Sequence, residues 1–91
     1  MRFEWDENKR KENLRRHGLD FRDVPFVFDL ETYTEYDDRF DYGEVRFYTI
    51  GYFNGAAVVV SHTETNDLIR VISFRKADKH EEELYFKKIR D

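Results

Sequence analysis

The chain has no cysteine, a single proline and only four glycines. Without cysteine, disulfide bonds and thiolate metal ligands are both excluded. No apolar run approaches the roughly 20 residues that a helix needs to cross a bilayer, so we expect no membrane association. The opening six residues are also too charged for a signal peptide, and we therefore expect a cytoplasmic protein.

Motifs for metals and nucleotide phosphates are missing as well. The three histidines, His17, His62 and His80, fall on separate elements, and no Asp-x-Asp loop occurs. The chain contains no glycine-rich phosphate loop and no Ser or Cys nucleophile elbow. We predict neither a metal site nor a cofactor.

Aromatic residues and charge are plentiful. Phe, Tyr and Trp make up 18% of the 91 residues, enough to fill one small core, so residues 1–91 are expected to form a single domain. The net charge of −4 argues against a protein that coats nucleic acid nonspecifically. Residues 29–44 carry seven acids and one base, Arg39. This acidic middle is either a binding face or a solvated loop without a partner.

The first half of the chain predicts two helices between short strands. Residues 3–5 have strand character, and Asp6 and Gly18 are a suitable N-cap and C-terminal glycine for a helix between them. That helix has only Leu14 as an apolar residue, so we expect its polar side chains to be exposed or to pair with other polar groups. Asp20 caps a second, short helix, and residues 32–36 are a candidate edge strand.

The second half predicts a hairpin, a third strand and a helix. Asn54-Gly55 is a strong two-residue turn that pairs Phe53 with Ala56 and Tyr48 with Ser61. A four-residue loop at 64–67 would then pair Thr63 with Leu68. Asp78 and Glu81 form a capping box for the last helix. The order of elements indicates an α+β fold.

The strand at 69–77 carries most of the chemistry. Its apolar residues are bounded by three cations, Arg70, Arg75 and Lys76. Guanidinium groups on a central strand pair with carboxylates, stack on aromatics or bind phosphate. In the register above, Arg75 shares a face with Val58 and Val60, whereas Arg70 lies on the opposite face unless a bulge intervenes.

Several strings of the chain, in order, resemble the BrnT family of type II toxin–antitoxin systems, within the RelE/ParE-like toxins. They are Phe3-Glu4-Trp5-Asp6-Glu7-Asn8-Lys9, Asn13-Leu14-Arg15-Arg16-His17-Gly18-Leu19-Asp20-Phe21, Val27-Phe28-Asp29, Glu44-x-Arg46, Ile50-Gly51 and Ile69-Arg70-Val71-Ile72-Ser73-x-Arg75-Lys76-Ala77, then Glu81 and Tyr85. Together they cover nearly the whole chain, which is far more specific than any one string.

The resemblance implies a RelE-like antiparallel sheet of three to four strands, packed by an N-terminal helix pair and a C-terminal helix. It also implies a ribonuclease that cleaves RNA without metal and inhibits translation and growth. A ribbon-helix-helix, BrnA-like antitoxin would neutralise it, in an assembly of two toxins and two antitoxins.

Two departures from the family pattern leave an alternative open. Thr65 stands where members often have Arg, and Phe74 stands where they have a small residue. A catalytically weakened homologue that only binds its antitoxin is the alternative. A single-strand RNA-binding protein that stacks bases on Tyr33, Tyr48 and Tyr52 is a weaker third reading.

Seven residues are candidates for the site, and Arg75 among them is matched to the strand-end arginine of the family. Arg75 is the first choice for stabilising transition-state charge, unless it pairs with an acid such as Glu81. Arg70 is expected to bind phosphate unless it is salt-bridged, and His62 is the candidate general base unless it is structural. The candidate RNA-binding residues are Lys76, Arg46, Tyr48 and Lys9.

Overall fold

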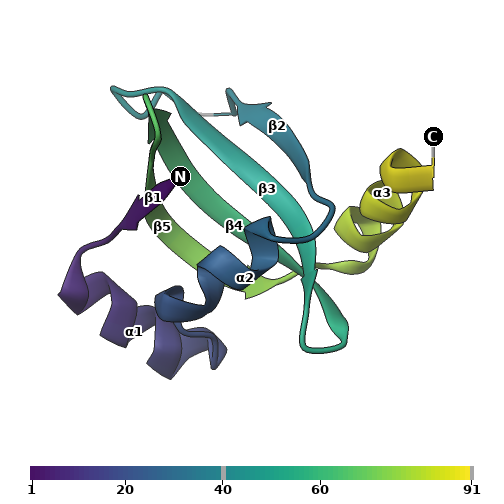
Figure 1. Ribbon diagram of the computed structural model, residues 1–91, viewed down its shortest axis with the longest axis horizontal. Coiled ribbons are helices and arrows are strands. Elements are labelled where there is room, and N and C mark those ends of the chain that lie inside the picture. Colours follow the sequence, from purple (N-terminus) through teal and green to yellow (C-terminus); the bar gives the residue numbers. More distant parts are fainter. Residues whose placement is uncertain (40, 91) are drawn as a thin grey trace.

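The computed structural model describes residues 1–39 and 41–90. They form a five-stranded sheet in the order β1-β5-β4-β3-β2, with helices on both faces (Figure 1). The elements along the chain are β1 (Arg2–Glu4), α1 (Glu7–His17), the 3-10 turn η1 (Phe21–Asp23), α2 (Val24–Phe28), β2 (Tyr33–Asp37), β3 (Arg46–Phe53), β4 (Ala56–Thr65), β5 (Leu68–Lys76) and α3 (Lys79–Arg90).

The α+β class is confirmed, but the predicted sheet of three to four antiparallel strands is wrong. The described sheet has five strands and is mixed, because β1 runs parallel to β5 and pairs Phe3 with Ile69. At the other edge, β2 pairs antiparallel with β3. The sequence indicates short strands at residues 3–5 and 32–36, and the structure places both at the edges of the sheet, as β1 and β2.

Local signals placed most helix ends correctly. The Asp6 carboxylate accepts hydrogen bonds from the backbone N–H groups of Asn8 and Lys9, and Gly18 adopts φ 73° at the end of α1. At α3, the Glu81 N–H donates to Asp78 Oδ1 and the Asp78 N–H donates to Glu81 Oε1. The predicted capping box is therefore confirmed.

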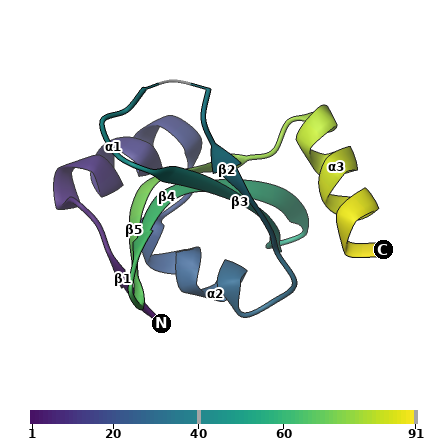
Figure 2. The same cartoon turned by 90° about the horizontal axis from the view of Figure 1, so that it is seen from above.

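The two sheet faces carry separate cores. On one face, Val58, Val60 and Phe74 pack with residues of η1 and α2, such as Phe21 and Val27. On the other face, residues of α3 pack against the sheet, and Figure 2 shows α2 and α3 at different sides of it. The second core has Ile50, Val59 and Tyr85 as its buried members.

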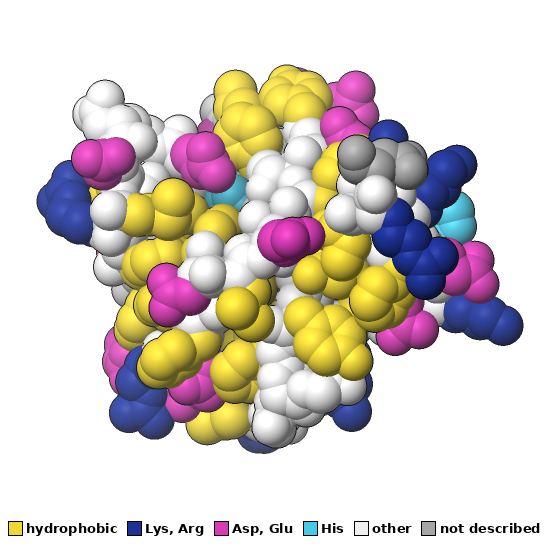
Figure 3. Space-filling model, turned by 45° about the vertical axis from the view of Figure 1, so that its right-hand side comes forward, with side chains coloured by type: hydrophobic (Ala, Val, Ile, Leu, Met, Phe, Trp, Pro, Cys, Tyr) yellow, Lys and Arg dark blue, Asp and Glu magenta, His cyan; other side chains and the backbone are white. Residues whose placement is uncertain are grey.

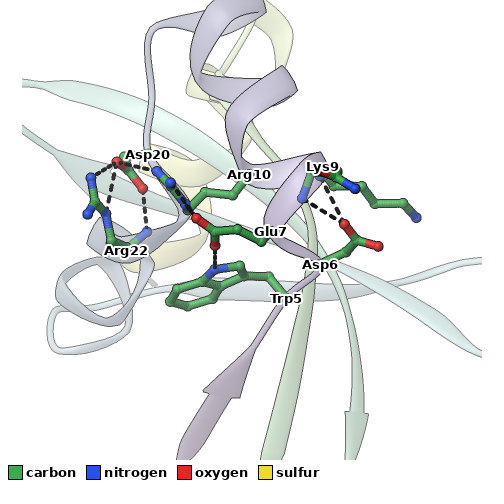
Figure 4. A network of polar contacts seen from close by, with 8 residues as sticks. Trp5, Asp6, Glu7, Lys9, Arg10, Asp20 and Arg22 are labelled. Atoms are coloured by element: carbon green, nitrogen blue, oxygen red, sulfur yellow. Dashed lines mark hydrogen bonds and ion pairs between the residues drawn. The ribbon is translucent and has the colours of Figure 1, made fainter.

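A buried arginine joins α1 to η1. Arg10 is 9% exposed, and its guanidinium donates to Glu7 Oε1 at 2.8 Å and to Asp20 Oδ2 at 3.2 Å (Figure 4). The Arg22 guanidinium, with help from Arg10, lowers the pKa of Asp20 to about 2. The polar content of α1 therefore serves in part to anchor this helix.

The register between β4 and β5 differs from the prediction. The turn contains only Asn66 and Asp67, so Leu68 pairs with Thr65 and not with Thr63. Asn66 adopts φ 55°, which asparagine tolerates better than most residues. A bulge then interrupts the ladder between Ser61 and His62. No residue pattern in β4 or β5 indicates this bulge in advance.

Candidate active site

The bulge changes the face on which Arg75 lies. Beyond it, Arg75 pairs with Val59 and Phe74 pairs with Val60. Val59 belongs to the core under α3, whereas Val60 and Phe74 belong to the core under α2. The prediction that Arg75 shares a face with Val58 and Val60 is therefore wrong, because one extra β5 residue reverses the alternation.

Arg75 is held by the first turn of α3. Its Nη1 lies 2.8 Å from Glu81 Oε1 and its Nη2 lies 2.9 Å from Glu81 Oε2, a two-point ion pair. The predicted alternative of an Arg75–Glu81 pair is confirmed. The hydrogen bond raises the pKa of Arg75 and lowers the pKa of Glu81, so both groups are charged at neutral pH.

An open pocket of about 250 Å³ lies beside this pair. The sheet contributes Tyr48, Val59 and Ser61 to its lining, together with Arg75. The segment after β2 contributes Arg39, and α3 with its cap contributes Asp78, His80, Glu81 and Leu84. The side chain of Arg75 is 33% exposed, so solvent reaches the guanidinium from this pocket.

Arg39 brings a second guanidinium to the pocket. Its Nε and Nη2 lie 2.9 and 3.0 Å from the two carboxylate oxygens of Asp37, and its Cζ lies 5.9 Å from the Tyr48 ring centroid. The Asp37 carboxylate raises the pKa of Arg39. Burial raises the pKa of Tyr48, which therefore keeps its phenolic proton at neutral pH. Two cations and a proton donor thus converge here.

Arg39 and His80 line the pocket but are not among the site residues predicted from the sequence. Arg39 is the one base among the acids of residues 29–44, and that isolation was an available signal. His80 follows the α3 cap directly, but only the packing of α3 on the sheet brings its exposed side chain to the pocket. An imidazole is the side chain best suited to move protons near pH 7.

Arg70 and Arg46 lie outside the pocket lining. Arg70 pairs with Glu4 of β1 at 3.0 Å, with both side chains nearly half exposed. Arg46 pairs with Glu44 at 3.1 Å, and its Cζ stacks 4.1 Å from the Tyr42 ring centroid. The bulge places Arg70 and Arg75 on one face of β5, yet the two arginines engage different acids.

The remaining candidates are dispersed. Lys76 is exposed at the end of β5, where its carbonyl accepts a hydrogen bond from Arg75. Lys9 lies on α1, beside a smaller groove that faces β5. Of the predicted residues, Arg75 and Tyr48 are the two that line the pocket together.

His62 is buried away from the pocket. Its side chain is 0% exposed, and its ring lies between Phe28 and Phe47 with Nε2 2.7 Å from Thr49 Oγ1. Desolvation lowers the pKa of His62, although Glu64 opposes the shift. This geometry fits the alternative that His62 has a structural role, and His62 lies outside the pocket.

Within residues 1–39 and 41–90, no group of three or more His, Cys, Asp or Glu side chains is arranged to hold a metal ion. Over the same part of the chain, no helix has the length and apolarity to cross a membrane.

Comparison with known proteins identifies the family. A family model described as "Ribonuclease toxin, BrnT, of type II toxin-antitoxin system" matches residues 5–81. A search of curated proteins gave no match. The match spans most of the chain: it begins directly after β1, covers β2 to β5 and includes the pocket residues up to Glu81. This chain therefore belongs to the BrnT family of ribonuclease toxins of type II toxin–antitoxin systems.

Proposed function

We propose that the chain is a metal-independent RNA endonuclease whose scissile phosphate binds in the pocket beside Arg75. The observation that carries this proposal is the convergence of Arg75 and Arg39 on an open, partly polar pocket. Metal-free cleavage requires fixed positive charge where the phosphorane develops, and guanidinium groups supply it.

The Arg75–Glu81 pair is compatible with phosphate binding. A guanidinium has five N–H donors. In Arg75, Glu81 accepts two of them and the Lys76 carbonyl accepts another at 3.2 Å. Donors on Nε and Nη2 remain for a phosphate oxygen. Glu81 then fixes the orientation of Arg75 before substrate arrives, which avoids an ordering cost during the reaction.

The proton transfers are assigned to the other pocket residues. RNA cleavage deprotonates a 2′-hydroxyl, whose oxygen attacks phosphorus, and protonates the departing 5′-oxygen. His80, the imidazole that lines the pocket, is the proposed acceptor of the 2′-hydroxyl proton, and solvent, which reaches this exposed position on α3, supplies the proton to the 5′-oxygen. Tyr48 is placed to donate a hydrogen bond to a phosphate oxygen.

The proposed biological setting follows from the family. The chain would act in the cytoplasm, where RNA cleavage stops translation and growth until a ribbon-helix-helix, BrnA-like antitoxin binds. The proposed assembly contains two toxins and two antitoxins, and the proposed fold relatives are RelE-like toxins. The proposed surface for the antitoxin consists of exposed apolar side chains of α2, β2 and the segments that adjoin them and β3: Phe26, Leu30, Tyr36 and Val45.

The alternative is a catalytically weakened toxin that only binds its antitoxin. The two-point ion pair between Arg75 and Glu81 favours this alternative, because a phosphate must compete with the Glu81 carboxylate for the Arg75 guanidinium. The Phe74 substitution does not favour it, since that ring is fully buried on the opposite face of the sheet. Thr65 lies exposed at the end of β4, four residues beyond the pocket residue Ser61.

The test expresses the chain alone and measures growth, then assays RNA cleavage by purified protein in EDTA. Arg75→Ala should relieve growth arrest and reduce cleavage by about 10²–10³-fold, the usual loss for one electrostatic stabiliser. Arg15→Ala is the matched control, because Arg15 also pairs with an acid but lies on α1. A folded wild-type protein that neither arrests growth nor cleaves RNA would establish the alternative.

A further inference from the structure

The side of α1 that faces β5 is basic. Lys9, Arg16 and His17 line a groove of about 160 Å³ whose floor includes Ile72 and Ser73. Lys9 and Arg16 are seven residues apart, which is two turns of helix, so they project from one side. A helix with a single apolar residue therefore presents cations, and not a hydrophobic stripe, toward the sheet edge.

These cations lack the acidic partners that others on α1 have. Arg10 is paired with Glu7 and Asp20, and Arg15 is paired with Glu12. Among the described residues, no ion pair is found for Lys9 or Arg16. Figure 4 shows the Lys9 side chain extended away from the Arg10 network. The acid in the groove, Glu12, has its carboxylate directed to Arg15, which lowers the pKa of Glu12.

The groove exists because β1 covers only the first part of β5. The parallel ladder ends at the pair Glu4 and Arg70, so the edge of β5 beyond Arg70 has no strand beside it. There Asn13 of α1 bonds to both the N–H and the carbonyl of Phe74, at 3.1 and 2.8 Å. This anchor fixes α1 beside the strand and fixes the position of its cations.

The groove adjoins the Arg75 pocket. Ser73 lines the groove, Ser61 lines the pocket, and the two serines are cross-strand partners. Neighbouring strands lie about 5 Å apart, so one strand spacing separates the two hollows. Both serines are half-buried and small, so no bulky side chain stands between the hollows at this pair.

We propose that this groove is a second phosphate-binding subsite, which holds a flanking phosphodiester of the single-stranded RNA whose scissile phosphate lies at Arg75. The inference rests on the proposed nuclease function and adds the path of the substrate. The strand crosses β4 and β5 at Ser61 and Ser73 and reaches Lys9, Arg16 and His17. Two unpaired cations and an imidazole suit a phosphate, and the acid of the groove, Glu12, is already paired with Arg15.

The test measures binding of a 2′-O-methyl RNA oligonucleotide, which cannot be cleaved, by anisotropy over a range of salt. The double variant Lys9→Gln/Arg16→Gln should weaken binding by about 10-fold at ~0.1 M salt and reduce the salt slope by about 1.4, that is 0.7 for each lost contact. The matched control is Lys11→Gln/Arg15→Gln, which removes the same charge from the same helix outside the groove. Its slope should equal that of wild type.

Kinetics on cleavable RNA separates this proposal from the nuclease proposal. The groove variant should raise KM with little change in kcat, whereas Arg75→Ala should lower kcat. If wild type cleaves and the groove variant behaves like the Lys11/Arg15 control, the subsite is overturned and the nuclease stands. If wild type does not cleave, the nuclease fails, and the binding comparison still decides the subsite. Polyglutamate is an anionic polymer without phosphates. If the groove variant lost as much affinity for polyglutamate as for RNA, the assignment of the groove to RNA would also be overturned.

Discussion

At the scale of single residues, position relative to the two sheet faces decides what each polar group does. Arg75 and His62 lie on neighbouring strands, yet Arg75 faces an open pocket and His62 is enclosed by aromatic rings. A guanidinium remains charged in either setting, whereas a buried imidazole is forced toward its neutral form. The burial of His62 therefore predicts a consequence for stability.

His62 should make the fold sensitive to mild acid. Its pKa in the folded state is lowered below the ordinary 6.5, so the unfolded chain binds a proton more readily. The free energy of unfolding should fall as pH drops below about 6.5, before the carboxylates titrate. Urea denaturation at pH 7, 6 and 5 measures this. His62→Gln, which keeps a hydrogen-bonding side chain near Thr49, should be less stable at pH 7 but flat across this window. An equal slope in both proteins would contradict the assignment.

At the scale of elements, α1 is attached by polar contacts. The Asn13 amide donates to the carbonyls of Phe74 and Leu19 and accepts from the Phe74 N–H, in a site that is 7% exposed. It takes the place that a sixth strand would have had along the open part of β5.

Asn13→Ala should leave buried backbone groups of Phe74 without partners, at a cost of about 2 kcal/mol or more in unfolding free energy. Chemical denaturation measures the loss. Asn8→Ala, an exposed change on the same helix, should stay within about 0.5 kcal/mol of wild type. Similar losses for the two variants would show that the Asn13 contacts add nothing beyond helix propensity.

The contact between α2 and β3 depends on a missing side chain. A Cβ at Gly51 would lie 2.6 Å from Val27 Cγ1 and 3.3 Å from Thr32 Cγ2. Gly51→Ala should therefore destabilise the fold by about 1–3 kcal/mol through overpacking. Adding Val27→Ala removes the clashing methyl, so the double variant should lose less than the sum of the single losses. If the losses in unfolding free energy of the two single variants simply added in the double variant, α2 would be able to move away from β3 without cost.

At the scale of the whole molecule, the proposed nuclease pocket and the proposed antitoxin surface are different regions. Figure 3 shows hydrophobic side chains interspersed with acids on one side of the molecule. Phe26 and Leu30 are 59% and 61% exposed, and exposed apolar groups that form a patch mark interaction sites in many proteins. Neither residue lines the Arg75 pocket.

Separate regions predict separable phenotypes. Phe26→Ser/Leu30→Ser should still arrest growth but resist neutralisation by the antitoxin, with at least ~10-fold weaker binding in calorimetry. Leu14→Ser is the control, because Leu14 is an exposed apolar residue on α1. If the double variant is neutralised as well as wild type, the antitoxin binds elsewhere.

The sequence alone determined the elements whose signals are local. The Asp6 and Asp78 caps, Gly18 and the Asn54-Gly55 turn act within a few residues, and each appears where the pattern indicates. The residues that match the family also indicate Arg75 as a candidate without reference to the structure.

Only the tertiary structure decided which side chains share a site. A single bulge between Ser61 and His62 moved Arg75 to the face of Tyr48, and the packing of α3 brought His80 and Glu81 to it. A bulge forms where it lets the side chains of both strands pack into the cores on the two faces of the sheet. That packing involves residues that are distant in sequence. The same holds for the groove beside α1, which exists because β1 is too short to cover β5.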